Sequence, residues 1–149
     1  MTCEHTALQL LLVEDNTADA ELTMDALRAG GLVNTVKWVR DGAEALELLL
    51  GNAQEGTPRL DLKLVLLDLR LPRVDGLEVL KRIRADVRTR LLPVVVLTSS
   101  QEESDLVRAY DLGANSYLVK PVESEMFMKA VAELGLYWML LNQLPGTTA

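Results

Sequence analysis

Four apolar segments of this chain each end in side chains that could do chemistry. They are the carboxylates of Glu14-Asp15, the carboxylate of Asp68, the hydroxyl of Thr98 and the ammonium of Lys120. If the segments are neighbouring strands of a parallel sheet, their carboxyl ends meet at one edge, where open α/β sheets bind ligands. Carboxylates gathered there would repel one another unless a cation lies among them, and oxygen ligands suit Mg²⁺ or Mn²⁺. The residue types therefore predict a metal site at this edge.

The two remaining side chains suit a phosphate group beside that ion. A lysine ammonium is a compact positive charge that can pair with phosphate, and a threonine hydroxyl can donate a hydrogen bond to a phosphate oxygen. In such a setting an aspartate can act as the nucleophile that takes up a phosphoryl group. We therefore predict a phosphoryl-transfer site in which Asp68 is the acceptor.

Alternating strands and helices are predicted to position these residues. The run Leu64–Leu67 is apolar without alternation, which is typical of a strand buried on both faces of a parallel sheet. Because a fully buried aspartate needs a partner, Asp68 is expected where this strand emerges. Predicted strands cover 7–13, 35–39, 64–67, 94–98 and 116–119, and predicted helices cover 17–29 and the stretches after 41, 75, 100 and 122. This alternation predicts an α/β fold of five βα units with a five-stranded parallel sheet.

Candidate N-caps and apolar faces accompany the predicted helices. The caps are Asn16, Asp41, Asp75 and Ser100, the last three with a glutamate three residues later. The sheet-facing residues are expected to be Ala43, Leu46 and Leu50 in the second helix, and Leu77, Leu80 and Ile83 in the third. A polar loop is predicted over 51–61.

Composition limits the class of protein. With 149 residues, 49% of them hydrophobic, the chain can form one domain. A net charge of −7 argues against a nucleic-acid-binding surface, which needs clustered Lys and Arg. The single cysteine, Cys3, excludes a disulfide framework. The first residues do not resemble a signal peptide, and no apolar run reaches the roughly 18 residues of a membrane span, so a cytoplasmic protein without membrane contact is expected.

The site residues, taken in order, carry a specific resemblance. Glu14-Asp15, Asp68, Thr98 and Lys120-Pro121 in a chain of five βα units resemble a bacterial response-regulator receiver domain over roughly 7–134. The resemblance implies a doubly wound, flavodoxin-like sheet with strand order 2-1-3-4-5. It leaves 1–6 as a disordered start and 135–149 as a helical extension and tail.

The resemblance also implies roles for single residues. Asp68 would take a phosphoryl group from a kinase phosphohistidine. Asp15, Asp68 and the backbone carbonyl of Arg70 would bind Mg²⁺ directly, and Glu14 would bind it through water. Further roles follow by position: Lys120 would pair with the phosphoryl group, Thr98 would hydrogen-bond it, Tyr117 would be an aromatic switch, and the Lys120–Pro121 peptide would be cis.

The end of the chain narrows the resemblance. An apolar stretch over 137–141 continues the last predicted helix and precedes Leu144-Pro145. This end, the long loop and the start Val13-Glu14-Asp15-Asn16 with Asp19 are similar to receivers that partner cyanobacterial and bacterial phytochrome kinases. Because exposed apolar patches usually mark partners, we predict a homodimer through the last strand, the last helix and the extension. Its interface residues would be Phe127, Leu134, Tyr137, Trp138 and Leu141.

Other interpretations of the same residues remain open. The chain could be a small aspartyl-phosphate phosphatase acting on external substrates, or a pseudo-receiver that only contacts proteins. It could also be a chemotaxis- or phosphorelay-type receiver with a non-phytochrome kinase. Glu14-Asp15 could merely cap a helix, Tyr117 could be simple packing, and the apolar tail could fold back on its own domain. The favoured prediction is a stand-alone response regulator that catalyses only its own phosphoryl uptake and loss.

Overall fold

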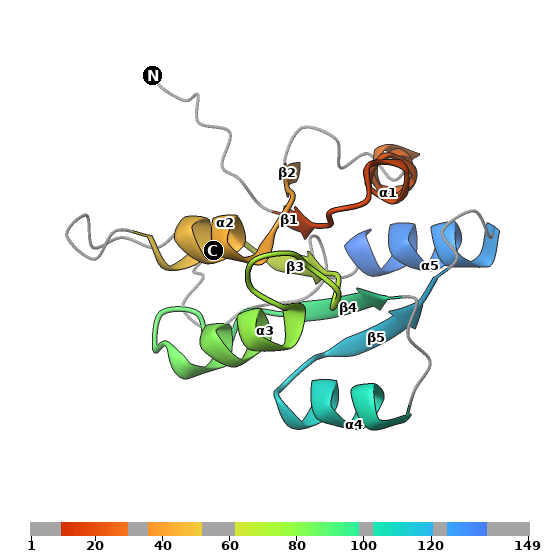
Figure 1. The fold of residues 1–149 in the computed structure, drawn as a ribbon. Helices are drawn as coiled ribbons and strands as arrows, with labels where there is room; N and C mark the ends of the chain where they lie inside the picture. Colours follow the sequence, from red (N-terminus) through yellow and green to blue (C-terminus); the bar gives the residue numbers. More distant parts are fainter. Residues whose placement is uncertain (1–9, 30–35, 52–61, 99–102, 121–124, 137–149) are drawn as a thin grey trace, which may run out of the picture.

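The described part of the chain contains one parallel sheet. The computed structural model describes residues 10–29, 36–51, 62–98, 103–120 and 125–136, and within them five strands form a sheet of order β2-β1-β3-β4-β5 (Figure 1). The strands are β1 (Leu10–Val13), β2 (Val36–Val39), β3 (Leu64–Leu67), β4 (Val94–Thr98) and β5 (Ser116–Val119). All neighbouring pairs are parallel. The predicted fold class and strand order are confirmed.

A helix follows each strand, and the helices cover both faces of the sheet. They are α1 (Thr17–Ala29), α2 (Gly42–Leu50), α3 (Gly76–Ala85), α4 (Glu103–Asp111) and α5 (Glu125–Leu136). Figure 1 shows α1 and α5 together on one face and α2, α3 and α4 on the other. In the described residues no helix combines the length and apolar character needed to cross a membrane.

The sheet divides the core into two apolar layers. Leu11, Val13, Val65 and Leu67 lie in the layer under α2, α3 and α4, whereas alternate residues of the same strands, including Leu10 and Leu66, lie in the layer under α1 and α5. Alternating side chains along each strand thus enter opposite layers. Burial of both layers explains why the strands are apolar without alternation.

The helix caps were predicted better than the helix faces. The Asp41 carboxylate accepts a hydrogen bond from Glu44 N at 2.7 Å, as expected of an N-cap. In α2 the predicted residue Leu46 is buried, and Leu50 is half-buried and packs against the core. Ala43 is only half-buried, while Ala45 and Leu49, which were not predicted, are buried. The core-facing side of α2 therefore includes the predicted Leu46 and Leu50 and is centred on Leu46 and Leu49. In α3 the predicted residues Leu77, Leu80 and Ile83 are buried, as is Val79.

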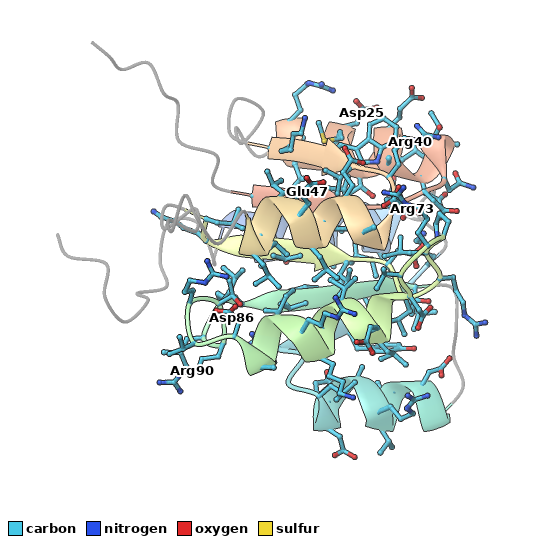
Figure 2. All side chains as sticks on the ribbon, turned by 60° about the vertical axis from the view of Figure 1, so that its left-hand side comes forward. Asp25, Arg40, Glu47, Arg73, Asp86 and Arg90 are labelled. Atoms are coloured by element: carbon cyan, nitrogen blue, oxygen red, sulfur yellow. The ribbon has the colours of Figure 1, made fainter. Side chains whose placement is uncertain are left out.

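Arg84 holds together the amino-terminal edge of the sheet, opposite the carboxyl ends of the strands. Its guanidinium donates two hydrogen bonds to Gly113 O (3.0 and 2.7 Å) and single bonds to Leu92 O (2.6 Å), Arg90 O (3.2 Å) and Asn115 Oδ1 (3.0 Å). Asn115 Oδ1 also accepts from Val94 N, the first residue of β4. Gly113 has φ of +101°, a conformation that favours glycine. Figure 2 marks this end of the molecule by Asp86 and Arg90, and the opposite end by Arg40 and Arg73.

Several sequence predictions fall outside the described residues. They concern the start of the first strand (7–9), most of the predicted loop (52–61), the cap Ser100, the start of the last helix (121–124) and the tail (137–149). The domain limits 1–6, 7–134 and 135–149 therefore stay predictions. In α5, Val131 is buried, and the side chains of Phe127 and Leu134 are outside the description.

Candidate functional site

The backbone places three of the predicted site residues one step beyond the strands. Glu14 N donates to Val39 O at 3.1 Å, Asp68 N donates to Val13 O at 3.0 Å, and Lys120 N donates to Thr98 O at 2.9 Å. The first residue after each of β1, β3 and β5 is thus still bonded to the neighbouring strand. These side chains consequently project from the carboxyl edge of the sheet, where ligands are expected.

The predicted carboxylates come together at this edge. One oxygen each from Glu14, Asp15 and Asp68 lies within 4.8 Å of the others. Glu14 is 1% exposed and Asp68 5% exposed, while Asp15 is exposed. Asp68 does follow the end of its strand as expected, but it is buried rather than emergent. Two buried carboxylates with an exposed third beside them fit a hard dication, whose charge would offset the repulsion among them and which would be reached from solvent on the Asp15 side.

Lys120 is the cation that the structure itself supplies to this cluster. Its Nζ donates to Glu14 Oε1 at 2.6 Å and to Asp19 Oδ2 at 2.9 Å, and lies 3.7 Å from Asp68 Oδ2. The side chain is 8% exposed. Three carboxylates thus lie within 4 Å of one ammonium group, and Asp15 lies beside two of them, so acidic groups outnumber the cation at this site and a further cation is attracted.

Burial and neighbouring charges change the protonation behaviour of the cluster. Burial raises the pKa of the Glu14 carboxyl from 4.5 to about 7, and the charge of Asp68 adds to this rise while Lys120 opposes it. Burial also raises the pKa of Asp68, against the opposing charge of Lys120. For Lys120, burial lowers the pKa, but hydrogen bonds to Glu14 and Asp19 outweigh it, so the pKa is raised and the ammonium is kept.

Trp38 in β2 and Arg40, which follows β2, contact the connection that carries Glu14 and Asp15. Trp38 Nε1 donates to the backbone oxygen of Glu14 at 2.7 Å. Arg40 lies over the Trp38 ring, 5.0 Å from its centroid, and donates to Thr17 Oγ1 at 3.0 Å. These contacts tie the β1–α1 connection, which carries Glu14 and Asp15, to the end of β2.

The predicted residues Thr98 and Tyr117 lie on the neighbouring strands β4 and β5. Thr98 ends β4 and is completely buried. Tyr117 pairs with Val96 across β4 and β5 and packs half-buried against the layer under α2, α3 and α4. By strand alternation Thr98 and Val96 share a face, so Thr98 and Tyr117 lie on the same side of the sheet.

Arg70 lies two residues after Asp68. Its backbone N donates to Asp68 Oδ1 at 3.5 Å, and its guanidinium pairs with Asp105 at 3.3 Å. The expected metal contact of its carbonyl stays a prediction. The expected cis peptide involves Pro121, and the expected interface residues Tyr137, Trp138 and Leu141 lie in the tail; all of these are outside the described residues.

Two contributors to the site were not assigned a role from sequence. Asp19 binds Lys120 from the first turn of α1, and Trp38 binds the Glu14 backbone from the edge strand β2. Asp19 was noted in the sequence only as part of the resemblance, and its place in the first turn of the helix after Glu14-Asp15 is the signal that could have assigned it to the site. Trp38 gives no such signal, because a tryptophan in a strand usually means packing.

Known proteins share both the sequence and this fold. The chain is 47% identical over 137 residues to a probable methanogenesis regulatory protein, FilR2, of Methanothrix harundinacea, covering 92% of this chain and 87% of FilR2. It is 51% identical to the bacteriophytochrome response regulator AtBRR, with a TM-score of 0.69 over 91% of this chain and 97% of AtBRR. The phosphorylated cyanobacterial phytochrome response regulator RcpA is 36% identical, with a TM-score of 0.81 over 95% of this chain and all of RcpA. The response regulator receiver domain model matches residues 10–132, and the chain therefore belongs to this family.

Proposed function

We propose that this response regulator accepts a phosphoryl group on Asp68 from a histidine kinase, with Mg²⁺ held by the acidic cluster. The observation that carries the proposal is the position of the buried Asp68 carboxylate. It has oxygens of Glu14 and Asp15 within 4.8 Å, and the Lys120 ammonium lies 3.7 Å from it. A nucleophilic carboxylate with a cation site and a fixed positive charge beside it suits phosphoryl transfer.

The proposed step needs only groups that the site and the donor supply. A carboxylate oxygen of Asp68 forms a bond to phosphorus while the bond from phosphorus to the phosphohistidine nitrogen breaks, and the imidazole leaves with that electron pair. Mg²⁺, when bound by Asp15, Asp68 and the Arg70 carbonyl with Glu14 through water, supplies charge neutralisation for the transferring group.

Lys120 pairs with a phosphoryl oxygen, and Thr98 donates a hydrogen bond to the modified group. Tyr117 then responds on the same face of the sheet, which gives a two-state switch biased by new charge.

The kinase is proposed to be of the phytochrome type. The relatives AtBRR and RcpA, both named as phytochrome response regulators, support this assignment by covering nearly the whole chain. The name of FilR2 favours the alternative, a kinase unrelated to phytochromes. Phosphotransfer from an autophosphorylated bacteriophytochrome kinase, compared with that from a chemotaxis kinase at equal concentration, separates the two. Faster transfer from the chemotaxis kinase would contradict the phytochrome assignment.

Asp68→Asn should abolish phosphoryl uptake. With Mg²⁺ and acetyl phosphate, the wild-type protein should gain the mass of one phosphoryl group, while the amide of the variant is not a nucleophile and should gain none. Asp75→Asn is a matched control, because Asp75 caps α3 on the same connection without belonging to the acidic cluster. Intact-protein mass spectrometry reads both results. Full labelling of Asp68→Asn would place the acceptor elsewhere.

The time course of phosphate release distinguishes a receiver from a phosphatase. A receiver transfers the group to itself and hydrolyses it slowly, so phosphate release should stop when the donor is consumed and should not extend to unrelated phosphomonoesters. Multiple turnovers on a small phosphomonoester would favour a phosphatase. A wild-type protein that binds Mg²⁺ but takes up no phosphoryl group would favour a contact-only pseudo-receiver.

We also propose a homodimer through β5, α5 and the extension that contains Tyr137, Trp138 and Leu141. On the described part of this surface, Val119 is 38% exposed and Met126 83% exposed, which supports an apolar contact. A symmetric pairing would cover the patch on both copies. Trp138→Glu should therefore yield a monomer in sedimentation velocity, with Trp138→Phe as the control. A dimer that survives the glutamate would lie on another surface.

A further inference from the structure

Asp19 shares the ammonium group of Lys120 with Glu14. The distance from Nζ is 2.6 Å to Glu14 Oε1 and 2.9 Å to Asp19 Oδ2, whereas Asp68 Oδ2 at 3.7 Å is beyond hydrogen-bond length. Lys120 therefore binds the carboxylates of β1 and α1 in preference to the proposed acceptor. All of these groups except Asp19, whose side chain is 24% exposed, are more than nine-tenths buried.

The position of Asp19 in α1 would ordinarily give its carboxylate a different task. Asp19 is the third residue of the helix, and its N–H donates to the N-cap Asn16 Oδ1 at 2.8 Å. An acid at this position commonly accepts a hydrogen bond from the N–H of the cap. Here Asn16 N donates instead to Glu14 Oε2 at 3.2 Å. The Asp19 carboxylate bonds Lys120, 101 residues further along the chain, so its contact is made with the site rather than with its own helix end.

The two carboxylates that bind Lys120 differ in their relation to the metal site. Glu14 belongs to the cluster of oxygens within 4.8 Å, and Asp19 does not. A dication bound in the cluster would compete with Lys120 for the charge of Glu14 and would weaken that contact. Asp19, which lies outside the cluster, would keep its contact with Lys120 and would then be the main group that restrains the lysine.

We propose that Asp19 is a positioning residue that restrains Lys120 on the α1 side of the site. The inference rests on the proposed function, in which Lys120 must pair with a phosphoryl oxygen on Asp68. Asp19 opposes that pairing in two ways, since it competes for the ammonium and its own charge repels the phosphoryl oxygens. The same negative charge attracts the dication. Asp19 therefore favours the metal-bound, unmodified state and disfavours the modified state.

The variant Asp19→Asn separates this role from simple structural support, because the affinities for Mg²⁺ and for a phosphoryl analogue should change in opposite directions. Its affinity for Mg²⁺ alone should fall by about fivefold, and its affinity for beryllium fluoride at saturating Mg²⁺ should rise by about fivefold. Beryllium fluoride is used because it binds an aspartate oxygen as a tetrahedral phosphoryl analogue. Isothermal titration calorimetry measures both constants. Damage to the fold would weaken both ligands together.

Asp25→Asn is the matched control, and Asp19→Ala is the second test variant. Asp25, labelled in Figure 2, lies on the same helix with a 59% exposed side chain and pairs with Arg28, so it makes the same charge change away from the site. It should alter neither affinity, and Asp19→Ala should repeat the opposite shifts. Asp19 variants that weaken both ligands, or change neither, overturn this inference while the proposed function stands. A wild-type protein that does not bind the analogue with Mg²⁺ overturns the proposed function and this inference with it.

Discussion

Replacing Arg84 with leucine is expected to lower the free energy of unfolding by about 3 kcal/mol. All five hydrogen bonds of the guanidinium go to uncharged oxygens, on Gly113, Leu92, Arg90 and Asn115. Leucine keeps an aliphatic stem but removes the donor from the Gly113, Leu92 and Arg90 oxygens, while Asn115 Oδ1 keeps its bond from Val94 N. The bonds to Gly113 O and Leu92 O are partly buried, and an acceptor that loses its partner away from water is costly. The loss should appear in urea unfolding as a lower midpoint with an unchanged slope.

Two further variants test why Arg84→Leu should lower the free energy of unfolding. Arg82→Leu changes the same residue type two positions away, where the side chain is 54% exposed and, among the described residues, pairs with Glu78 of its own helix alone, so it should cost under about 0.5 kcal/mol. Arg84→Lys keeps the charge but cannot reach several acceptors at once, since one ammonium replaces a planar fork of donors. If the lysine variant is as stable as the wild type, charge rather than bridging geometry explains the role of Arg84.

Without metal, the protein is expected to lose about 3 kcal/mol of stability between about pH 4.5 and pH 8. The folded pKa of Glu14 is about 7 against an ordinary 4.5, because burial favours the neutral carboxyl. A raised folded pKa gives stability that is complete below the ordinary value and is lost as pH rises through the folded value. The pKa of Asp68 is raised for the same reason and acts in the same direction. Asp41 and Asp86 have pKa values lowered below 3.8, so they stay ionised across this window.

Mg²⁺ should restore the stability that ionisation removes. The ion binds deprotonated carboxylates, so its stabilising effect should be larger at about pH 8 than at about pH 5, where protons must be displaced first. Urea unfolding at the two pH values, with EDTA or with Mg²⁺, measures both effects. Glu14→Gln is the control, because an amide does not titrate; the variant should reduce the metal-free pH dependence to the part that Asp68 contributes. A metal-free wild type that is more stable at about pH 8 than at about pH 5 would contradict the assignment.

The fold could be predicted in detail because local signals agreed with it. Asn16 as a cap and the glycines after Ala29 predicted α1 with its observed limits, and the apolar run before Lys120 predicted β5. The buried face of α2 was predicted only in part, because Leu48, Leu49 and Leu50 are consecutive and their sequence does not say which of them is most deeply buried. Such ambiguity is resolved only by packing against neighbouring elements.

The core of the site was also predictable, while its supporting contacts were not. Glu14, Asp15, Asp68 and Lys120 each end an apolar run, so parallel topology alone brings them to one edge. The bond between Asp19 and Lys120 depends on how the first turn of α1 passes the end of β5, which no local pattern encodes. Arg84 presents the same problem, because it is one of four arginines between 82 and 90. Which of them bonds to the backbone at the amino-terminal edge of the sheet depends on the fold and not on a local pattern.

The two apolar layers of the core have a consequence for strand register. In a sheet with one polar face, sliding a strand by one residue exposes its apolar side chains, and this cost holds the strand in place. Both faces of β1 and β3 are apolar here, so hydrophobicity alone would tolerate such a slide. The polar residues at the strand ends oppose a slide, because it would move Asp68 into the apolar interior or away from Lys120 and Glu14. The residues proposed to carry out the chemistry are thus also the markers that align the strands.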